Sequence, residues 1–377
     1  MRTMEVWHRR GGDVTVRPDE LTYGSVLNAL SKCGGGEKAA VEAEGILRGV
    51  VDDDGRYGDD DGYGGGGVVG GGVGPNTVMY NAAISAWANS GCEDAPARAE
   101  ALLREMQERR RRTAAAAPSS SRWRNSDDDE YDDDEEGCDP DARTYSAVIT
   151  SYARSDRKDS AVRAESLLNE MEESTLTVVP DAVVYNSVAN AWSKMAERSS
   201  YGGGGEAVDA VGNAERILMI RSPYDPDNYA VNSILDANAR AGGGLDSQRR
   251  AMKILTWMKG EGTYGGHDHV VEEGGSGKLY RGSGPDAYAY SAAIRAVSTA
   301  PAKDGGDKSD AVTYVLNLLE EAKEAGAASV EVYNVALDAL GKISTAASSA
   351  ELIQGILIDM EEKKLMTTTK TWPNRIT

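Results

Sequence analysis

The sequence contains little of what enzymes use for catalysis. It holds 3 histidines and 3 cysteines in 377 residues, and the cysteines at 33, 92 and 138 lie too far apart for a disulfide framework or a paired metal site. His267 and His269 stand in a glycine-rich stretch with no third metal ligand nearby. The stretch EEGGSGKLY lacks the first glycine and the Ser or Thr of a phosphate-binding loop. The sequence therefore indicates no enzyme, no cofactor, no metal and no small-molecule substrate.

Long apolar runs and an excess of basic residues are missing as well. No stretch approaches the roughly 20 apolar residues of a membrane-spanning helix, so no membrane partner is expected. Asp and Glu number 61 against 41 Lys and Arg, which gives a net charge of −20. Part of this charge is local, because residues 52–61 contain six Asp and residues 127–139 contain ten Asp or Glu. A net negative charge of this size repels the phosphates of a nucleic acid and so disfavours binding to one.

One short phrase, Pro-Asp followed by three residues and Tyr, returns along the chain with small variations. It opens segments at residues 18, 75, 140, 180, 226 and 285, among them PDARTYSAVITSY and PDAVVYNSVANAW, and a seventh copy without Pro-Asp starts at Ser329. Proline disfavours helix before it, and Asp caps the free N–H groups of a first helical turn. Apolar residues follow at helical spacing, as at Tyr80, Ile84 and Trp87. Each phrase therefore predicts the start of a helix.

A second amphipathic segment follows the first in each repeat. Its clearest copies are RAEALLREM, RAESLLNEM and RAMKILTWM, which end at Met106, Met171 and Met258, and a looser copy ends at Met360. A helix pair of this size cannot bury its apolar face alone, so the pairs must stack. The sequence predicts an all-α fold, an α-solenoid of about seven antiparallel helix-pair repeats that spans residues 18–366.

Low-complexity sequence separates the predicted repeats. Acidic or glycine-rich insertions, expected to be flexible and solvated, lie near residues 52–74, 109–139, 199–207 and 260–284. Residues 1–17 form an N-terminal stub, which we interpret as a truncated start, and residues 367–377 form a C-terminal tail.

The two-helix repeat resembles that of the pentatricopeptide repeat (PPR) family. The first helix carries Pro-Asp-x-x-x-Tyr-Asn/Ser and the second carries Ala-Glu-x-Leu-Leu-x-x-Met, which together are the signature of that family. The resemblance covers roughly residues 18–366, although the inserted loops depart from the family's contiguous repeats. It implies sequence-selective binding of single-stranded RNA, one base per repeat. It also implies a role in RNA processing, stability or translation in a mitochondrion or plastid, although no targeting signal is legible.

The resemblance further implies which side chains read the bases. They are the residue after the first-helix Tyr and the capping residue of the next repeat. The pairs are Gly24 with Asn76, Asn81 with Asp141, Ser146 with Asp181, Asn186 with Asp227, Asn232 with Asp286, and Ser291 with Ser329, while Asn334 has no clear partner. In the family's pairing pattern Asn with Asp resembles a uracil reader and Ser with Asp a guanine reader. Repeats two to five then spell U-G-U-U.

A column of mostly basic residues stands nine positions after the Tyr position. Its members are Lys32, Asn89, Arg154, Lys194, Arg240, Thr299 and Lys342. Nine helical steps turn the side chain about 180° from the Tyr, so this basic column should face solvent. We interpret its Lys and Arg residues as candidate contacts to RNA phosphates. Favourable charge at the C-terminal end of each first helix is the alternative explanation.

Aromatic residues mark another position of the first helix. Tyr229 and Tyr288 stand two residues past their Asp, where the family sandwiches bases between side chains, and they could stack on a base. Arg143 and Glu331 occupy the same position in other repeats, so the predicted sandwich is incomplete.

The residues alone leave other interpretations open. Each Asp is also a natural N-cap whether or not RNA binds, and Asn and Ser fit the polar edge of an amphipathic helix. A protein-binding scaffold of the α-solenoid type is the alternative function, favoured by the acidic charge and the uneven repeat spacing. An accessory subunit of an organellar ribosome or processing complex would combine both functions.

Overall fold

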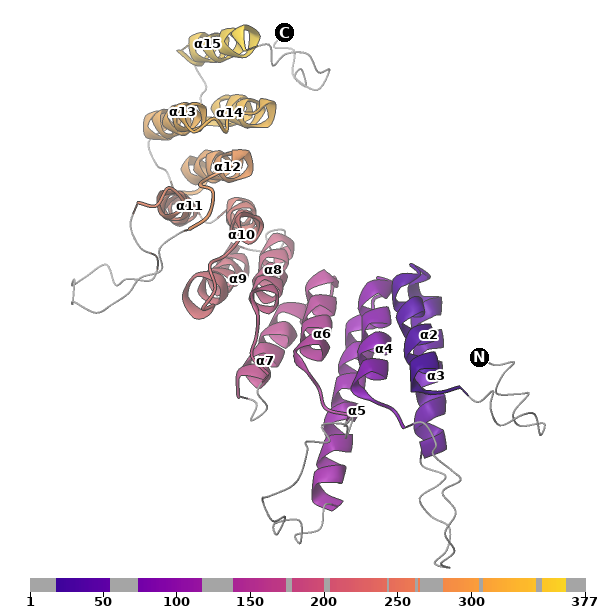
Figure 1. The fold of residues 1–377 in the computed structure, drawn as a ribbon. Helices are drawn as coiled ribbons and strands as arrows, with labels where there is room; N and C mark the ends of the chain where they lie inside the picture. The colour runs from indigo at the N-terminus through magenta and orange to yellow at the C-terminus, as the bar shows by residue number, and fades with distance from the viewer. Residues whose placement is uncertain are drawn as a thin grey trace, which may run out of the picture. The chain divides into compact units, whose positions relative to one another are not determined.

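The structure is a computed structural model that describes the chain in ten stretches (Figure 1). The described residues are 18–54, 74–116, 138–173, 178–199, 204–242, 244–261, 264, 281–304, 308–343 and 348–363. The N-terminal stub, the C-terminal tail and most of the predicted insertions lie outside these residues. Within them, no helix is long and apolar enough to cross a membrane.

The first helix of every predicted repeat is present. These helices are α2 (Glu20–Lys32), α4 (Thr77–Ser90), α6 (Ala142–Arg154), α8 (Ala182–Ser199), α10 (Asn228–Ala241), α12 (Ala287–Asp304) and α14 (Val330–Ile343). Wherever the phrase contains a proline, the helix begins two residues after it. The predicted helix starts are therefore confirmed.

A second helix follows each of them. These helices are α3 (Gly36–Asp54), α5 (Ala95–Ala116), α7 (Ser160–Glu173), α9 (Gly204–Glu215), α11 (Leu245–Met258), α13 (Lys308–Glu324) and α15 (Ser348–Glu362). Helix α9 continues directly into the π-helical segment η3 (Arg216–Arg221). The described residues thus contain seven helix pairs, which confirms the predicted all-α repeat fold.

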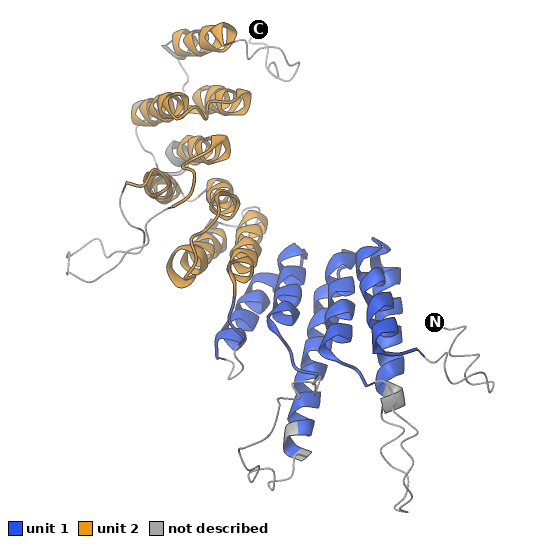
Figure 2. Cartoon of the chain, viewed as in Figure 1, with its two compact units in different colours: residues 1–180 blue, residues 181–377 orange. Residues whose placement is uncertain are grey.

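The chain divides into two compact units, residues 1–180 and residues 181–377 (Figure 2). In unit 1 the first helices α2, α4 and α6 pack in succession, and in unit 2 α8, α10, α12 and α14 do the same. A second helix contacts its own first helix and the first helix of the next pair, as α3 contacts α2 and α4, and α11 contacts α10 and α12. Each unit is therefore a stretch of α-solenoid with one layer of first helices and one of second helices.

Side-chain caps fix where the first helices begin. The carboxylates of Asp141 and Asp227 accept hydrogen bonds from backbone N–H groups three residues further on, at 2.8 and 2.7 Å. Asn76 caps α4 in the same way at 3.0 Å. The cap removes an unsatisfied donor of the first turn, an effect worth about 1 kcal/mol per helix.

A buried tyrosine joins the two helices of a repeat. The hydroxyl of Tyr80 in α4 donates to Glu105 of α5 at 2.7 Å, and Tyr333 in α14 donates to Asp359 of α15 at 2.7 Å. Tyr145 approaches Glu170 of α7 in the same way at 3.3 Å. In each case the carboxylate precedes the buried methionine of the second helix. We call this contact the tyrosine latch.

Another buried contact joins one repeat to the next. The indole N–H of Trp87 in α4 donates to Glu44 of α3 at 2.9 Å, and Tyr152 in α6 donates to Glu100 of α5. Glu44 is only 7% exposed and also pairs with Arg48 at 2.7 Å. The aromatic ring fills apolar space while its polar group donates a hydrogen bond to a carboxylate that an arginine also contacts.

Two of the repeats in unit 2 depart from the pattern of the others. In the α10–α11 repeat, the latch positions hold the buried apolar pair Val231 and Trp257 instead of Tyr and Glu. In η3 the N–H of Ser222 bonds to the carbonyl of Ile217, five residues back, at 2.9 Å. The consecutive residues 217–219 of this wider turn are all buried.

The borders of two predicted insertions differ from expectation. Helix α5 runs through the arginines at 109–112, where Arg112 pairs with Glu108 at 3.1 Å along the helix, so the insertion predicted near 109 begins beyond Ala116. Helix α9 begins at Gly204, inside the insertion predicted at 199–207. In the predicted insertion at 260–284, Tyr264 is buried against Trp257 with 5.5 Å between ring centroids.

We predict that the buried tyrosines make the fold sensitive to alkali. Burial, together with hydrogen bonds to carboxylates, raises the pKa of Tyr80 and Tyr152 and raises the pKa of Tyr333 to about 12. The unfolded chain ionises near the ordinary value of about 10, so it loses protons first, and rising pH favours unfolding. The contribution of these tyrosines to the free energy of unfolding should be constant below pH ~9 and fall steadily above pH ~10.

Urea unfolding at a series of pH values measures this loss. Tyr80→Phe removes one such hydroxyl and should make the alkaline decline shallower, although the variant itself is less stable. A free energy of unfolding that stays level up to pH ~11 would contradict the latch as an energetic contact.

Candidate nucleic-acid interface

A groove of about 810 Å³ lies along the first helices of unit 1. It is formed by α2, α4 and the start of α6. Six residues singled out from the sequence line it, namely Gly24, Lys32, Asn76, Asn81, Asp141 and Arg143. The groove therefore collects several of the predicted base-reading positions of this unit and one predicted phosphate contact, Lys32, while their roles stay predictions.

Asn81 and Asp141 contact each other directly across two neighbouring helices. The amide nitrogen of Asn81 in α4 lies 3.2 Å from both carboxylate oxygens of Asp141 at the start of α6. The hydroxyl of Thr144 donates to the amide oxygen of Asn81 at 2.6 Å. Because a carboxylate only accepts hydrogen bonds, these contacts fix the orientation of the Asn81 amide at both of its ends.

The same contact occurs twice in unit 2. The amide nitrogen of Asn186 lies 3.3 Å from Asp227, and that of Asn232 lies 3.0 and 2.9 Å from the two oxygens of Asp286. Three of the predicted Asn–Asp pairs are thus hydrogen-bonded pairs between consecutive first helices. We call them the Asn–Asp clamps.

The clamp carboxylates also cap their helices. Asp286 accepts the backbone N–H of Ala289 at 3.0 Å, and Asp141 accepts that of Thr144 while it faces Asn81. The capping role and the predicted reading role therefore fall on one group and do not exclude each other. Since capping uses only part of a carboxylate's acceptor capacity, the other sites remain for the Asn.

Neither clamp of unit 2 has the second fastening, and in the clamp of Asn186 the position of Thr144 is taken by Ala230. The amide oxygen of Asn232 is buried and has no hydrogen-bond partner within the described residues. Ala289 of α12 occupies the position that Thr144 occupies in α6, and it has no hydroxyl to offer. The clamps at Asn81 and Asn232 share their residue types but differ in this neighbour.

The remaining predicted reading positions form no clamp. Gly24 has no side chain, and Ser146 belongs to unit 1 while Asp181 belongs to unit 2. Ser291 is 0% exposed and its hydroxyl has no partner in the described structure, which contradicts the predicted contact between this side chain and a base. Ser329 caps α14, where its hydroxyl lies 3.4 Å from the N–H of Val332.

Exposed apolar side chains repeat two residues after the capping residue. Tyr229 is 76% exposed and Tyr288 is 63% exposed, as their predicted stacking role requires. Leu21, Val78 and Val183 occupy the same position of their helices and are exposed by 79, 61 and 58%. The sequence analysis missed these aliphatic residues, although their constant offset from the capping residue could have identified them.

Four of the five basic members of the basic column are exposed and Lys194 is half-buried, and their charges are unevenly neutralised. Arg240 pairs with Asp236 at 2.7 Å and with Glu197 at 3.4 Å, and Lys342 pairs with Asp338 at 2.6 Å. In unit 1, by contrast, the guanidinium of Arg154 donates to the amide oxygen of Asn89 at 3.1 Å. Lys32 forms no ion pair within the described residues.

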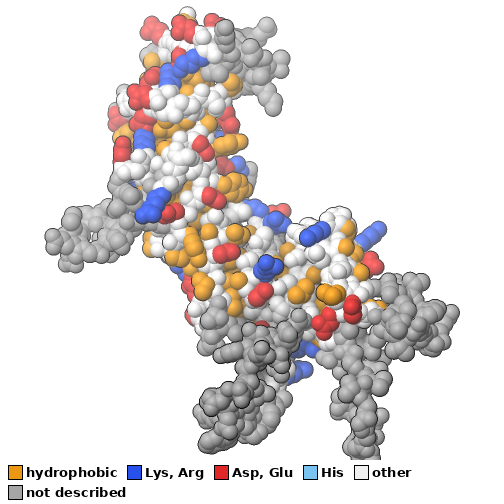
Figure 3. Space-filling view, in the orientation of Figure 1, with side chains coloured by type: hydrophobic (Ala, Val, Ile, Leu, Met, Phe, Trp, Pro, Cys, Tyr) orange, Lys and Arg blue, Asp and Glu red, His pale blue; other side chains and the backbone are white. Residues whose placement is uncertain are grey.

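Unit 1 therefore holds the less neutralised part of the basic column. Figure 3 shows basic and hydrophobic side chains intermingled on the face of unit 1 seen in that view. An RNA phosphate would meet Lys32 and Arg154 without first displacing a carboxylate.

The described residues contain no cluster of three His, Cys, Asp or Glu side chains placed to hold a metal ion. Cys33, Cys92 and Cys138 form no disulfide with one another. His267 and His269 lie outside the described residues.

No family model and no curated protein matches the chain. Among solved structures it is similar to the pentatricopeptide repeat protein PPR10 in complex with an 18-nt psaJ RNA element, and to a cysteine-to-serine variant of that protein with the same element. Each is 16% identical, with a TM-score of 0.32, over 98% of this chain. The chain spans about half of their length, 52%. A likeness at this level says nothing about the ligand of this chain.

Two reciprocal substitutions test the hydrogen bond that the hydroxyl of Thr144 donates to the amide oxygen of the clamp. Thr144→Val should lower the free energy of unfolding by about 1–3 kcal/mol, because it leaves the amide oxygen of Asn81 without a donor and removes a capping contact. Ala289→Ser should raise it by up to about 1 kcal/mol, because it offers a donor to the buried amide oxygen of Asn232. Chemical denaturation of both variants beside the unaltered chain measures the effects. Equal stability of Thr144→Val and the unaltered chain would show that this fastening carries no energy.

Proposed function

We propose that the chain binds single-stranded RNA along the first helices of its repeats and reads bases at the Asn–Asp clamps. The observation that carries the proposal is the clamp itself, repeated at Asn81, Asn186 and Asn232 in the same position of the first helices α4, α8 and α10. An amide and a carboxylate side by side offer donors and acceptors in a fixed order, which is what the Watson–Crick edge of a base requires.

The exposed side chains around a clamp suit the face of a base. Tyr229 precedes Asn232 by one turn of α10, and Tyr288 follows Asp286 at the start of α12. A base that contacts the clamp at Asn232 would therefore have an exposed aromatic ring on each neighbouring helix to stack against. Stacking of this kind contributes about 1–3 kcal/mol per base.

The base order and the cellular role rest on the resemblance of the repeat motif alone. By the family's pairing pattern, repeats two to five read U-G-U-U from 5′ to 3′ as the chain runs from N to C. The chain would act passively, by masking a site, blocking a nuclease or remodelling RNA structure. Its role would lie in RNA processing, stability or translation in a mitochondrion or plastid.

Exchanging one clamp residue tests the reading role. Asn186→Ser keeps the cap at Asp227 but turns the pair into the Ser–Asp type, so the preferred base at the third of the four positions should change from U to G. A good base contact is worth about 1–3 kcal/mol of discrimination. Selection of bound sequences from a random RNA pool, followed by sequencing, measures the preference.

Asn213→Ser is the matched control, because it makes the same chemical change on α9, the second helix of the same repeat. Its selected sequences should equal those of the unaltered chain. If the unaltered chain enriches no sequence, or if Asn186→Ser enriches the same bases, reading at this clamp is excluded. Recovery of proteins and no RNA after crosslinking in cells would favour the protein-binding scaffold.

Salt dependence tests the basic column. Replacing Lys32 and Arg154 with Ala should make the slope of log affinity against log salt concentration less steep by about 1.4. Each phosphate contact on a single strand contributes about 0.7 to this slope. Replacing Arg240 and Lys342 should change the slope less, because carboxylates already neutralise them. Filter binding of a uridine-rich RNA over a range of salt concentrations measures both slopes. Equal slopes for both double variants would contradict the distinction.

A further inference from the structure

In the α12–α13 repeat the hydrogen bond of the tyrosine latch is not formed, and we call this latch open. Tyr290 occupies the latch position of α12, and Glu321 occupies the carboxylate position of α13. Glu321 instead pairs with Lys259, at the end of α11, at 2.5 Å. The hydroxyl of Tyr290 makes no hydrogen bond within the described residues, although the residue is only 2% exposed. Its counterparts Tyr80 and Tyr333 both donate to a carboxylate.

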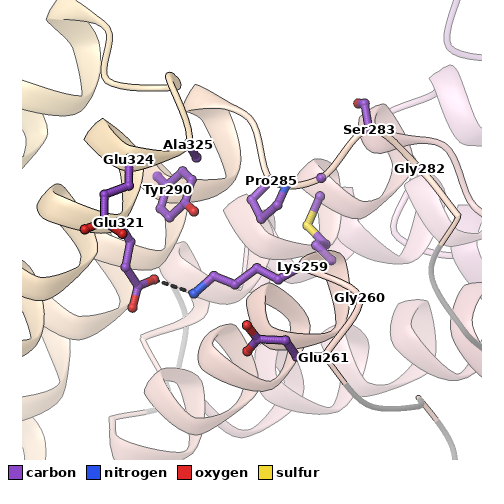
Figure 4. Close-up of a pocket in the computed structure, with 12 residues that line it drawn as sticks. Lys259, Gly260, Glu261, Gly282, Ser283, Pro285, Tyr290, Glu321, Glu324 and Ala325 are labelled. Carbon is purple, nitrogen blue, oxygen red and sulfur yellow. Dashed lines mark hydrogen bonds and ion pairs between the residues drawn. The ribbon is translucent and has the colours of Figure 1, made fainter.

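The unpaired hydroxyl faces a pocket of about 690 Å³ in unit 2. The pocket lies between the ends of α11 and α13 and the linker that leads into α12. Figure 4 shows Lys259 reaching across it to Glu321, with the ring of Tyr290 on one wall. The volume lies within the range of pockets that bind small organic groups.

The pocket is acidic. Glu261, Glu321 and Glu324 line it together with one cation, Lys259, so carboxylates outnumber the cation by two. Glu261 and Glu324 form no ion pair within the described residues. The carbonyl ends of α11 and α13 add negative potential on the same side. Burial, and then the charges of Glu321 and Glu261, raises the pKa of Tyr290, so its hydroxyl keeps its proton.

We propose that this pocket binds an arginine side chain of a protein partner. A guanidinium carries five N–H donors in a plane, which can serve two carboxylates and the oxygen of Tyr290 together. A lysine ammonium is more strongly hydrated and offers no planar fork, so it fits this set of acceptors less well. A metal ion is a poorer occupant, because the described residues contain no cluster of metal-ligand type.

This inference does not depend on RNA binding. The pocket uses no clamp residue and no member of the basic column, so the two activities can succeed or fail separately.

The test uses the full chain with fluorotyrosine in place of tyrosine, and fluorine NMR. The Tyr290 signal is assigned by its disappearance in Tyr290→Phe. A capped peptide Gly-Gly-Arg-Gly-Gly should shift this signal in a saturable way. The same peptide with citrulline, which keeps the shape of arginine without its charge, should not.

Substitution of the carboxylates then locates the binding. The double variant Glu261→Gln and Glu324→Gln should weaken the arginine peptide at least about tenfold, the loss expected when a charged hydrogen bond is removed. The double variant Glu320→Gln and Glu351→Gln removes the same charge outside the pocket and should bind as the unaltered chain does. The proposal is overturned if the arginine peptide shows no saturable shift, if the citrulline peptide binds equally well, or if both double variants weaken binding alike.

Discussion

The repeats depend on a single polar group at the start of each first helix. At Asp141 one carboxylate caps α6 through the N–H of Thr144 and holds the amide of Asn81 on the preceding first helix. The start of one helix and the side-chain geometry of its neighbour are therefore set by the same atoms. Replacing the Asp would disturb both at once, whereas the Asn can be exchanged while the cap remains. The chemistry of the surface can thus vary at the Asn without loss of the helix that supports it.

The acidic excess of the chain is partly structural. Glu44, Glu100 and Glu105 accept hydrogen bonds from aromatic side chains between packed helices. Glu44 is buried, Glu100 and Glu105 are half-buried, and each of the three also pairs with an arginine, so these acids add little to the potential that a distant ligand meets. Net charge alone is therefore a weak guide to what this chain binds. The local balance of positive and negative charge on the first helices is more informative. Arg240 in unit 2 pairs with a carboxylate, whereas Lys32 in unit 1 forms no ion pair within the described residues.

The sequence predicted the helix starts well because their signals are local. Proline and the capping side chain that follows it act within four residues, and the six first helices that have both signals begin where they indicate. Asn232 and Asp286 were paired as predicted base readers from the repeat register of the family, whereas the hydrogen bond between them was not predicted, and the reading role stays a prediction.

What the sequence could not supply depends on packing between helices. The pairing of Arg240 with Glu197 joins α10 to α8, and the burial of Ser291 follows from the neighbours of α12. The exposure of Leu21 could not be predicted either, because an apolar residue at helical spacing by itself indicates a core position. The open latch at Tyr290 arises because Lys259 of another repeat takes the carboxylate, and no pattern within one repeat reveals such a competitor.

The contact between Trp87 and Glu44 has a thermodynamic consequence for how unit 1 comes apart. It joins one repeat to the next, so its free energy belongs to the coupling between neighbours and not to the intrinsic stability of either repeat. In a linear array, coupling of this kind decides whether repeats melt together or fray one at a time from an end. The hydrogen bond of Glu44 thus influences how cooperatively unit 1 unfolds. Contacts between neighbouring repeats, of which this is one, set the sharpness of the unfolding transition.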